Sequence, residues 1–258
     1  MKKLYLILIF IISSQLLSAQ ELSSFQSGEW LKFKLSYSGW WKAGNATLEV
    51  FDSVYNNIPV HKVVAKGWTT GPINWVFKVE DHYESHFDMQ TGMPYKFVRK
   101  TNEGGYTKNR IIEFDHKQKK AFIKDIKKKS KSSVKIEKDI QDLVSSYYFL
   151  RNNYQTGSLK KGEVVKLNVF FDSETFLFKL KYLGNETINT IYGQIKCIKF
   201  RPYVMAGRVF KDEESLTLWV TADANKVPIK IKADLDVGSL RADLVAFKGL
   251  KHPFEIQF

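Results

Sequence analysis

The chain has 258 residues, of which 44% are hydrophobic and 14% are aromatic, and it carries a formal net charge of +13. This composition is sufficient for a large buried apolar core. The only cysteine is Cys197, which excludes a disulfide within the chain, so apolar packing must hold the fold together.

The first nineteen residues have the pattern of a secretory signal peptide. Lys2 and Lys3 give a positive start, an apolar run covers residues 4–12, and the segment ends at Ala19, a small residue that signal peptidases accept. The run is shorter than the roughly 20 residues of a membrane-spanning helix, so a retained anchor is the weaker interpretation. We expect cleavage after Ala19, a mature chain of 239 residues with a charge of +11, and no lipid-modified amino terminus, because the cysteine lies far away.

Alternation of apolar and polar residues dominates from Trp30 onward and is typical of β-strands. In the first such segment, Leu31 and Phe33 face one side while Lys32 and Lys34 face the other. The pattern predicts thirteen strands: Trp30–Tyr37, Ala46–Tyr55, Ile58–Lys66, Trp75–Phe87, Pro94–Lys100, Tyr106–Phe114, Ala121–Lys127, Val164–Phe171, Thr175–Leu183, Ile195–Tyr203, Ser215–Thr221, Val227–Asp236 and Ser239–Phe247. Short turns separate most of them, which predicts antiparallel pairing, since parallel strands need long crossovers.

One segment breaks this period. From Asp139 to Asn152 the apolar residues recur at helical spacing, with Asp139 or Asp142 available for the first turn and Arg151 at the end. The predicted fold class is therefore mainly β. We expect a large curved antiparallel sheet or an open half-barrel around one central amphipathic helix. Residues 20–258 are predicted to form a single β-rich domain, which could consist of two similar halves that meet near residues 139–152.

Several phrases together resemble the exported bacterial family of domains of unknown function 3108. These phrases are Gly28-Glu29 before the first strand, residues 39–44 after it, the helical phrase Asp142–Arg151, and residues 218–230 with their Trp-x-x-x-Asp hairpin. The resemblance covers roughly residues 25–247 and implies an antiparallel β-rich envelope protein without an established chemistry. In architecture, the chain is also similar to periplasmic lipoprotein carriers, whose curved sheet wraps apolar cargo around a helix.

Tryptophans near predicted loops are the candidate ligand-binding residues. Trp40 and Trp41 lie in a connection bounded by glycines, and Trp68 and Trp75 lie around a turn. Aromatic side chains in loops stack on sugars or close over apolar cargo, although they more often plug the end of a sheet. Neighbours on a strand face opposite ways, so Trp40 and Trp41 cannot both enter the core, and one should be exposed or line a cleft.

Positive charge is concentrated between His116 and Lys138, where ten lysines stand against two acidic residues. Export and the lack of arginine in this stretch argue against a nucleic-acid partner. The stretch is either a solvated edge that discourages aggregation of sheets or a contact with anionic lipid or polysaccharide. The candidate contact residues are Lys117, Lys119, Lys120, Lys127, Lys128 and Lys129.

Patterns for catalysis and for metal binding are weak. His82, Glu84, His86 and Asp88 would project from one strand face, but side chains spread along a strand do not converge on a metal, so we expect a solvated face. The chain contains neither Gly-x-Ser-x-Gly nor His-Glu-x-x-His, and it has no phosphate-binding glycine loop. We therefore assign no catalytic residue, metal or cofactor, and Cys197 is expected to be a small buried thiol.

These observations favour a non-enzymatic exported protein of the periplasm or outer envelope that holds an apolar or amphipathic ligand, or an envelope partner, on a concave face. Two alternatives stay open. One is a hydrolase that acts on envelope polymers with Glu80, Asp81 or Glu84, and the other is a structural or adhesion module of the cell surface. The expected partners are lipid, polysaccharide or an envelope protein, with peripheral membrane contact.

Overall fold

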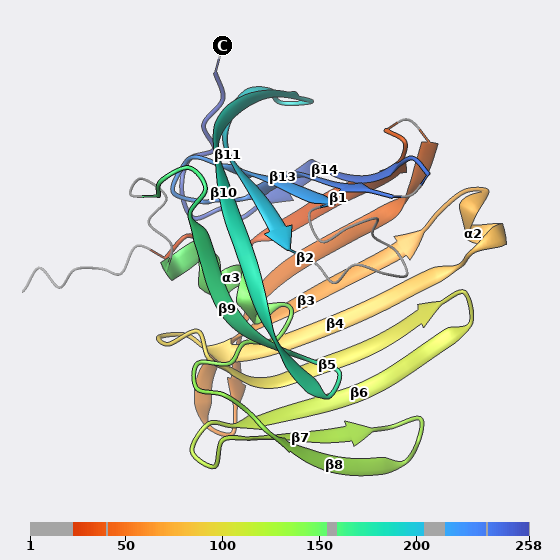
Figure 1. The fold of residues 1–258 in the computed structure, drawn as a ribbon, viewed down its shortest axis with the longest axis vertical. Coiled ribbons are helices and arrows are strands. Elements are labelled where there is room, and N and C mark those ends of the chain that lie inside the picture. Colours follow the sequence, from red (N-terminus) through yellow and green to blue (C-terminus); the bar gives the residue numbers. More distant parts are fainter. Residues whose placement is uncertain (1–22, 40, 154–158, 204–214, 236, 258) are drawn as a thin grey trace, which may run out of the picture.

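The computed structural model describes residues 23–39, 41–153, 159–203, 215–235 and 237–257. The expected signal peptide and Trp40 lie outside these ranges. Within them, fourteen strands form one antiparallel sheet in the order β8-β7-β6-β5-β4-β3-β2-β1-β14-β13-β12-β11-β10-β9. The sheet is curved and open, with β8 and β9 at its edges (Figure 1), which confirms the prediction of a large curved antiparallel sheet.

The first eight strands are β1 (Trp30–Tyr37), β2 (Trp41–Tyr55), β3 (Ile58–Thr69), β4 (Val79–Asp88), β5 (Pro94–Glu103), β6 (Tyr106–Asp115), β7 (Lys120–Asp125) and β8 (Ser130–Lys135). The other six are β9 (Val164–Phe171), β10 (Glu174–Thr190), β11 (Gly193–Tyr203), β12 (Leu216–Thr221), β13 (Pro228–Asp234) and β14 (Ser239–Lys248). Two helices lie between described strands: α2 (Ile73–Val76) precedes β4, and α3 (Ser145–Asn153) precedes β9.

Strand β1 joins the two halves of the chain, because it pairs with β2 on one side and with β14 on the other. Phe33 of β1 lies opposite Ala46 of β2 and also opposite Leu244 of β14. The N-terminal meander β1–β8 and the C-terminal meander β9–β14 therefore form one continuous sheet.

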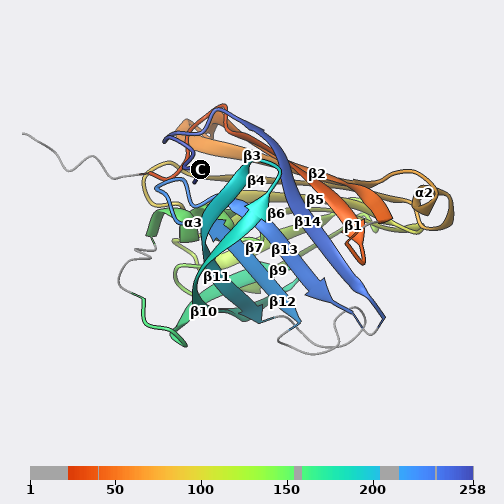
Figure 2. The same cartoon turned by 90° about the horizontal axis from the view of Figure 1, so that it is seen from above.

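β-Bulges contribute to the curvature of this sheet, which we call its curl. The pairing register shifts between Lys32 and Phe33, Leu35 and Ser36, His86 and Phe87, Tyr182 and Gly184, and Trp219 and Val220. Each bulge increases the local twist and bends its strand. The curl carries the β9–β10 hairpin back across the sheet, so that Asp172 in its turn lies 2.7 Å from Arg99 of β5 (Figures 1 and 2).

Helix α3 begins at Ser145 and not at Asp139, the expected start. Asp142 is its N-cap, because Asp142 Oδ1 accepts hydrogen bonds from the backbone N–H groups of Val144 and Ser145, both 2.8 Å long. The preceding segment is not helical: Lys138 and Asp139 form a turn, and Gln141 forms a parallel bridge with Val169 of β9. Tertiary pairing with an edge strand has therefore overridden the helical spacing in the first turn.

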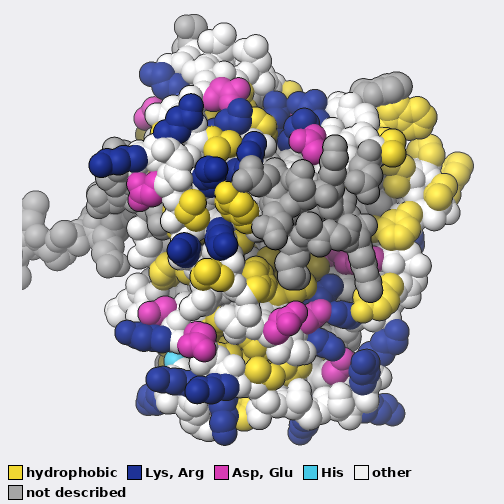
Figure 3. All heavy atoms as spheres, in the orientation of Figure 1, with side chains coloured by type: hydrophobic (Ala, Val, Ile, Leu, Met, Phe, Trp, Pro, Cys, Tyr) yellow, Lys and Arg dark blue, Asp and Glu magenta, His cyan; other side chains and the backbone are white. Residues whose placement is uncertain are grey.

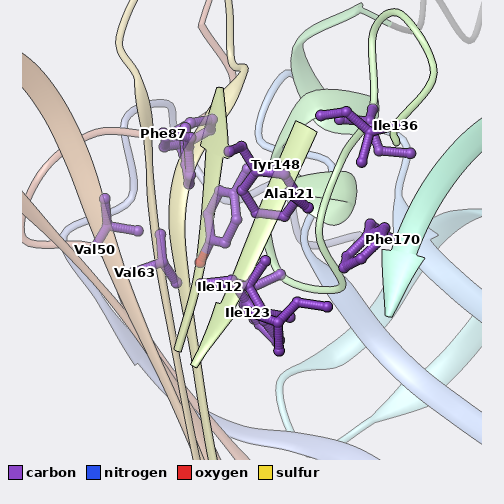
Figure 4. Packing of buried hydrophobic residues seen from close by; sticks show 14 residues of the cluster. Val50, Val63, Phe87, Ile112, Ala121, Ile123, Ile136, Tyr148 and Phe170 are labelled. Carbon is purple, nitrogen blue, oxygen red and sulfur yellow. The ribbon is translucent and has the colours of Figure 1, made fainter. Parts of the chain in front are cut away.

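The largest core cluster lies between helix α3 and one face of the N-terminal meander. Tyr148 of α3 is almost completely buried there, and Figure 4 shows it among side chains of β2, β4, β6 and β7. The labelled neighbours are Val50, Val63, Phe87, Ile112, Ala121, Ile123, Ile136 and Phe170. We call this side of β2–β7 the helix-covered face.

Several strands differ from the prediction, and β10 runs seven residues beyond its predicted end. Strand β8 was not predicted, because it is polar and exposed and shows no alternation, which suits its place at the edge of the sheet. Strand β4 begins at Val79, since the residues before it form the single turn of α2. Strand β2 begins at Trp41, so the second tryptophan of the expected connection is the first strand residue.

No helix in the described part of the chain is long and apolar enough to cross a membrane.

Candidate functional site

Exposed apolar side chains gather at one end of the sheet. They lie on or beside the β1–β2, β3–β4, β5–β6 and β13–β14 connections, which the antiparallel register places at the same end. We call this set the apolar rim: Trp41, Trp75, Val76, Phe77, Tyr106 and Val237. Trp75 and Val76 are 87% and 88% exposed. Figure 3 shows yellow side chains gathered at the corner where Figure 1 places α2.

Polar contacts hold the α2 loop in place beneath these side chains. Thr69 Oγ1 donates a hydrogen bond to Asn74 Oδ1 and accepts one from the Val79 N–H, each 2.9 Å long. Phe77 covers Gly104 of the next turn so closely that a methyl group there would lie 2.3 Å from its ring. The loop is therefore supported from both sides, and its apolar tip projects into solvent. Exposed apolar patches on soluble proteins commonly mark interaction sites.

The six candidate lysines divide between the two ends of the sheet. Lys127, Lys128 and Lys129 form the β7–β8 turn at the rim end, next to the β5–β6 turn, and Lys127 Nζ lies 2.5 Å from Thr107 Oγ1. The other three, Lys117, Lys119 and Lys120, lie at the opposite end of β7. A six-residue strand separates the two groups by roughly 17 Å. They do not form one patch, and only the first group flanks the apolar rim.

The candidate tryptophans also occupy different places. Trp41 and Trp75 belong to the rim, whereas Trp68 lies on the face of β3 that points away from α3, opposite Glu80 of β4. It lines an open depression of about 950 Å³ together with His82 and Lys100. Trp40 lies outside the described residues. The structure thus brings two of the four predicted residues to the same surface.

A cationic cluster lies on the helix-covered face, near the rim. Arg99 Nη1 lies 2.7 Å from Asp172 Oδ1, Lys108 Nζ pairs with Asp172 Oδ2, and Arg110 Nη1 lies 3.5 Å from Asp172 Oδ1. Arg110 Nε also lies 3.0 Å from Asp125 Oδ2. Beside this cluster is a cavity of about 480 Å³. Its charged lining residues are Lys108, Arg110, Lys127, Lys128 and Asp125.

Sequence reasoning missed this cluster. Lys108 and Arg110 stand two apart on β6 and share a face with the core residue Ile112, which is the only local signal. Asp172 reaches them from more than sixty residues away through the curl of the sheet. Such a long-range pairing leaves no periodic trace in the sequence.

The three carboxylates of the hydrolase alternative do not converge. Glu80 and Glu84 lie on the outer face of β4, where Glu80 pairs with Lys78 at 3.0 Å, whereas alternation places Asp81 on the helix-covered face. Burial, followed by the nearby charge of Glu103, raises the pKa of Asp81 to about 6. Burial alone would raise the pKa of Glu84, but hydrogen bonds from His82 and Lys62 lower it to about 2.

His82 and His86 on the outer face of β4 both contact the carboxylate between them, Glu84. His82 Nε2 lies 2.7 Å from Glu84 Oε1, and His86 Nε2 lies 3.6 Å from Glu84 Oε2. Among the residues that the structure describes, no group of three or more His, Cys, Asp and Glu side chains could hold a metal ion. Cys197 is buried, and desolvation raises the pKa of its thiol to about 12. A thiol of this kind is a poor nucleophile at neutral pH.

The family profile described as "Protein of unknown function (DUF3108)" matches residues 32–245. The fold is similar to a solved β-barrel-like protein of the domain of unknown function DUF1849 from Brucella abortus, with a TM-score of 0.59 at 11% sequence identity, over 88% of this chain and 99% of that one. A second solved structure, described as an exported protein with a YmcC-like fold from Bacteroides fragilis, has a TM-score of 0.32 at 10% identity, over 87% of this chain and 97% of that one. No curated protein matches the chain.

The likeness to the Brucella protein concerns the fold alone at this level of identity. The family match, in contrast, extends from β1 to β14 and includes the phrases that suggested the resemblance except Gly28-Glu29, which lies before it. This protein therefore belongs to the DUF3108 family, whose function is unknown.

Proposed function

We propose that this chain is a non-enzymatic protein of the cell envelope that binds the surface of an anionic lipid membrane with its apolar rim. The observation that carries the proposal is the position of Trp75 and Val76 on a supported loop, where both side chains are almost fully exposed. An envelope location is in line with the signal-peptide pattern of residues 1–19.

The composition of the rim matches the interface of a bilayer. Aromatic side chains such as Trp75, Phe77 and Tyr106 have an apolar body that suits the headgroup region of a membrane. Full burial of a large apolar side chain is worth about 1.5–3 kcal/mol, and each lysine near an anionic surface adds about 1 kcal/mol. With three lysines in the β7–β8 turn beside it, the rim would bind the membrane reversibly, and the strength of binding would depend on the negative charge of the lipid.

The architecture supports a role in binding over one in catalysis. A curved sheet presents its loops at one end as a rigid rim, while its helix-covered face carries an apolar core beside a cationic cluster. The carboxylates Glu80, Asp81 and Glu84 are divided between two faces, which gives the hydrolase alternative no common site. An amphipathic molecule has the matching pair of properties, an apolar part and a charged head.

Co-sedimentation with phosphatidylglycerol vesicles and with phosphatidylcholine vesicles tests the proposal. The wild type should bind the anionic vesicles at low salt and should release at high salt. The double variant Trp75→Ser/Val76→Ser and the triple variant of Lys127, Lys128 and Lys129 to Gln should each lower the bound fraction several-fold.

The chain offers a matched control for each variant. Ile191 is 70% exposed in the β10–β11 turn at the other end of the sheet, so Ile191→Ser should leave binding unchanged. The same holds for the triple change of Lys117, Lys119 and Lys120 to Gln, which removes equal charge from the far end of β7. Equal losses in variants and controls, or no binding by the wild type, would refute a membrane-binding rim.

A further inference from the structure

We propose that the cationic cavity beside β6 is a binding site for a phosphate group, and that Asp172 in the β9–β10 turn is a built-in anion that occupies part of this site when no ligand is bound. The site does not rest on membrane binding by the rim. Its ligand class is any molecule that presents a phosphate monoester, either a lipid headgroup or a soluble phosphate.

Asp172 is held as a ligand anion would be held. Its two carboxylate oxygens form ion pairs with Arg99, Lys108 and Arg110, which belong to the adjacent strands β5 and β6. Burial alone would raise the pKa of Asp172, but hydrogen bonds from Lys108 and Arg99 lower it, so the group is a carboxylate at neutral pH. Asp172 thus lies against three cations, one of which, Arg110, also pairs with Asp125.

The cluster retains unused binding capacity. Arg99 is 7% exposed, its guanidinium carbon lies 4.6 Å from the centre of the Phe171 ring, and its Nε is buried without a hydrogen-bond partner among the described residues. A buried donor without a partner is costly, and a larger oxyanion with more acceptor oxygens would satisfy it. A phosphate monoester supplies three acceptor oxygens and a charge of about −1.5 to −2.

The neighbouring cavity provides the approach to this cluster. Lys108 and Arg110 line both the cavity and the contact with Asp172, and Lys127 and Lys128 add two exposed cations on the rim side. Against these four cations the cavity presents a single carboxylate, Asp125. A volume of about 480 Å³ is ample for a phosphate group and for part of the molecule that carries it.

The turn that carries Asp172 is suited to exchange with a ligand. Asp172 has a φ of +60°, and it sits at the tip of a hairpin formed by β9, which is an edge strand, and β10. Arg110 Nη1 also lies 3.3 Å from the hydroxyl of Ser173. Phe170, two residues before Asp172, packs in the core with its ring 5.8 Å from that of Phe114 of β6. An anion that replaces Asp172 would therefore displace the turn residues, while Phe170 keeps the hairpin on the sheet.

Isothermal titration calorimetry of the full chain with inorganic phosphate, and separately with dihexanoyl phosphatidic acid below its micelle concentration, tests the proposal. Asp172→Asn is the informative variant, because Asn tolerates positive φ, has nearly the same shape as Asp, and replaces the anionic carboxylate with a neutral amide. Removal of the competing anion should lower the dissociation constant of phosphate at least about tenfold. Lys108→Met in the Asp172→Asn background should abolish the gain.

Two further variants keep the test decisive. Lys128→Met removes a cation from the cavity in an exposed turn, where folding is not at risk, and should weaken binding; Lys117→Met at the far end of β7 should not. Tighter binding of the phosphatidic acid than of phosphate identifies a lipid headgroup, and equal affinities identify a soluble phosphate.

Failure of Asp172→Asn to bind either probe more tightly than the wild type would overturn the proposal. Equal weakening by Lys128→Met and Lys117→Met would overturn it as well, because it would show a general effect of net charge. Both probes are soluble and involve no bilayer, so this result is independent of the vesicle experiment on the rim.

Discussion

Arg151 of helix α3 and Glu29, the residue before β1, form a buried bidentate ion pair. Arg151 Nη1 lies 2.6 Å from Glu29 Oε1, and Nη2 lies 2.8 Å from Oε2. The same guanidinium donates to the backbone carbonyls of Ser24 and Asn225. One side chain of the helix therefore ties together the N-terminal segment, β1 and the β12–β13 turn.

Breaking this pair should destabilise the protein strongly. Arg151→Met leaves Glu29 buried and without its cation, so we expect a loss of about 3–5 kcal/mol in the free energy of unfolding, measured with urea. Lys199→Met, which breaks the exposed pair with Glu186, should cost less than about 1 kcal/mol. A cost for Arg151→Met as small as that of the control would contradict a structural role for the buried pair.

The N-cap of helix α3 should make stability depend on pH. Burial raises the pKa of Asp142 to about 6, although the hydroxyl of Ser85 at 2.5 Å and the helix N-terminus favour its charged form. Between about pH 4 and pH 6 the folded protein then holds a proton that the unfolded chain releases. The free energy of unfolding therefore falls as the pH rises through this range. The stability of Asp142→Asn relative to wild type should therefore rise from pH 5 to pH 7 by on the order of 1 kcal/mol.

The control for this effect is Asp142→Ala, which removes the cap itself. It should cost about 1 kcal/mol or more through the lost N–H partners, on top of any pH-dependent gain. Urea unfolding at several pH values separates the two contributions. A constant difference between Asp142→Asn and wild type across this range would show that Asp142 does not titrate there.

Gly249 should tolerate no side chain. Its φ is +66°, and a Cβ atom would lie 2.2 Å from the backbone carbonyl oxygen of Gly28, where the chain after β14 passes the segment before β1. Gly162 has a φ of +92° but open space around it. Gly162→Ala should cost about 1–2 kcal/mol through strain, and Gly249→Ala about 1–3 kcal/mol more. Thermal unfolding measures both, and equal costs would mean that the two backbones separate easily.

The hydroxyl of Tyr148 is a candidate for a stabilising change. The side chain is almost completely buried in the largest core cluster, and its hydroxyl has no hydrogen-bond partner among the described residues. Tyr148→Phe should leave the free energy of unfolding unchanged or raise it by about 1 kcal/mol, whereas Tyr148→Ala should lower it by about 3–5 kcal/mol. A loss of more than about 1 kcal/mol in the phenylalanine variant would show that the hydroxyl is satisfied.

Period-two alternation was sufficient to predict most strands of this protein, because one face of each strand is buried and the other is solvated. The prediction failed where both faces of a strand are equally exposed. Strand β8 is exposed on nearly every residue, and Val134 is its one side chain that packs against the core cluster among those described. The predicted start of the helix was wrong for another reason. Gln141 pairs with β9, and a pairing with this distant edge strand cannot be predicted from the local sequence.

The candidate site was predictable only in its residue types. The sequence pointed to aromatic and lysine residues, and Trp75 and Lys127 lie at one end of the sheet. Their grouping was not predictable, because it depends on which turns the antiparallel register places side by side. The same register carries Lys117 to the far end of β7, although only ten residues separate it from Lys127.

The sequence by itself determined the class of this protein: a mainly β chain without a disulfide, with an export pattern at its start and one helix in its middle. These properties follow from composition and local periodicity. Only the tertiary structure decided that the strands form a single open sheet, that its curl brings Asp172 onto Arg99, and that Arg151 meets Glu29 across the core. The physical reason is that such contacts depend on bulges and on pairings between distant strands, and neither leaves a local pattern along the chain.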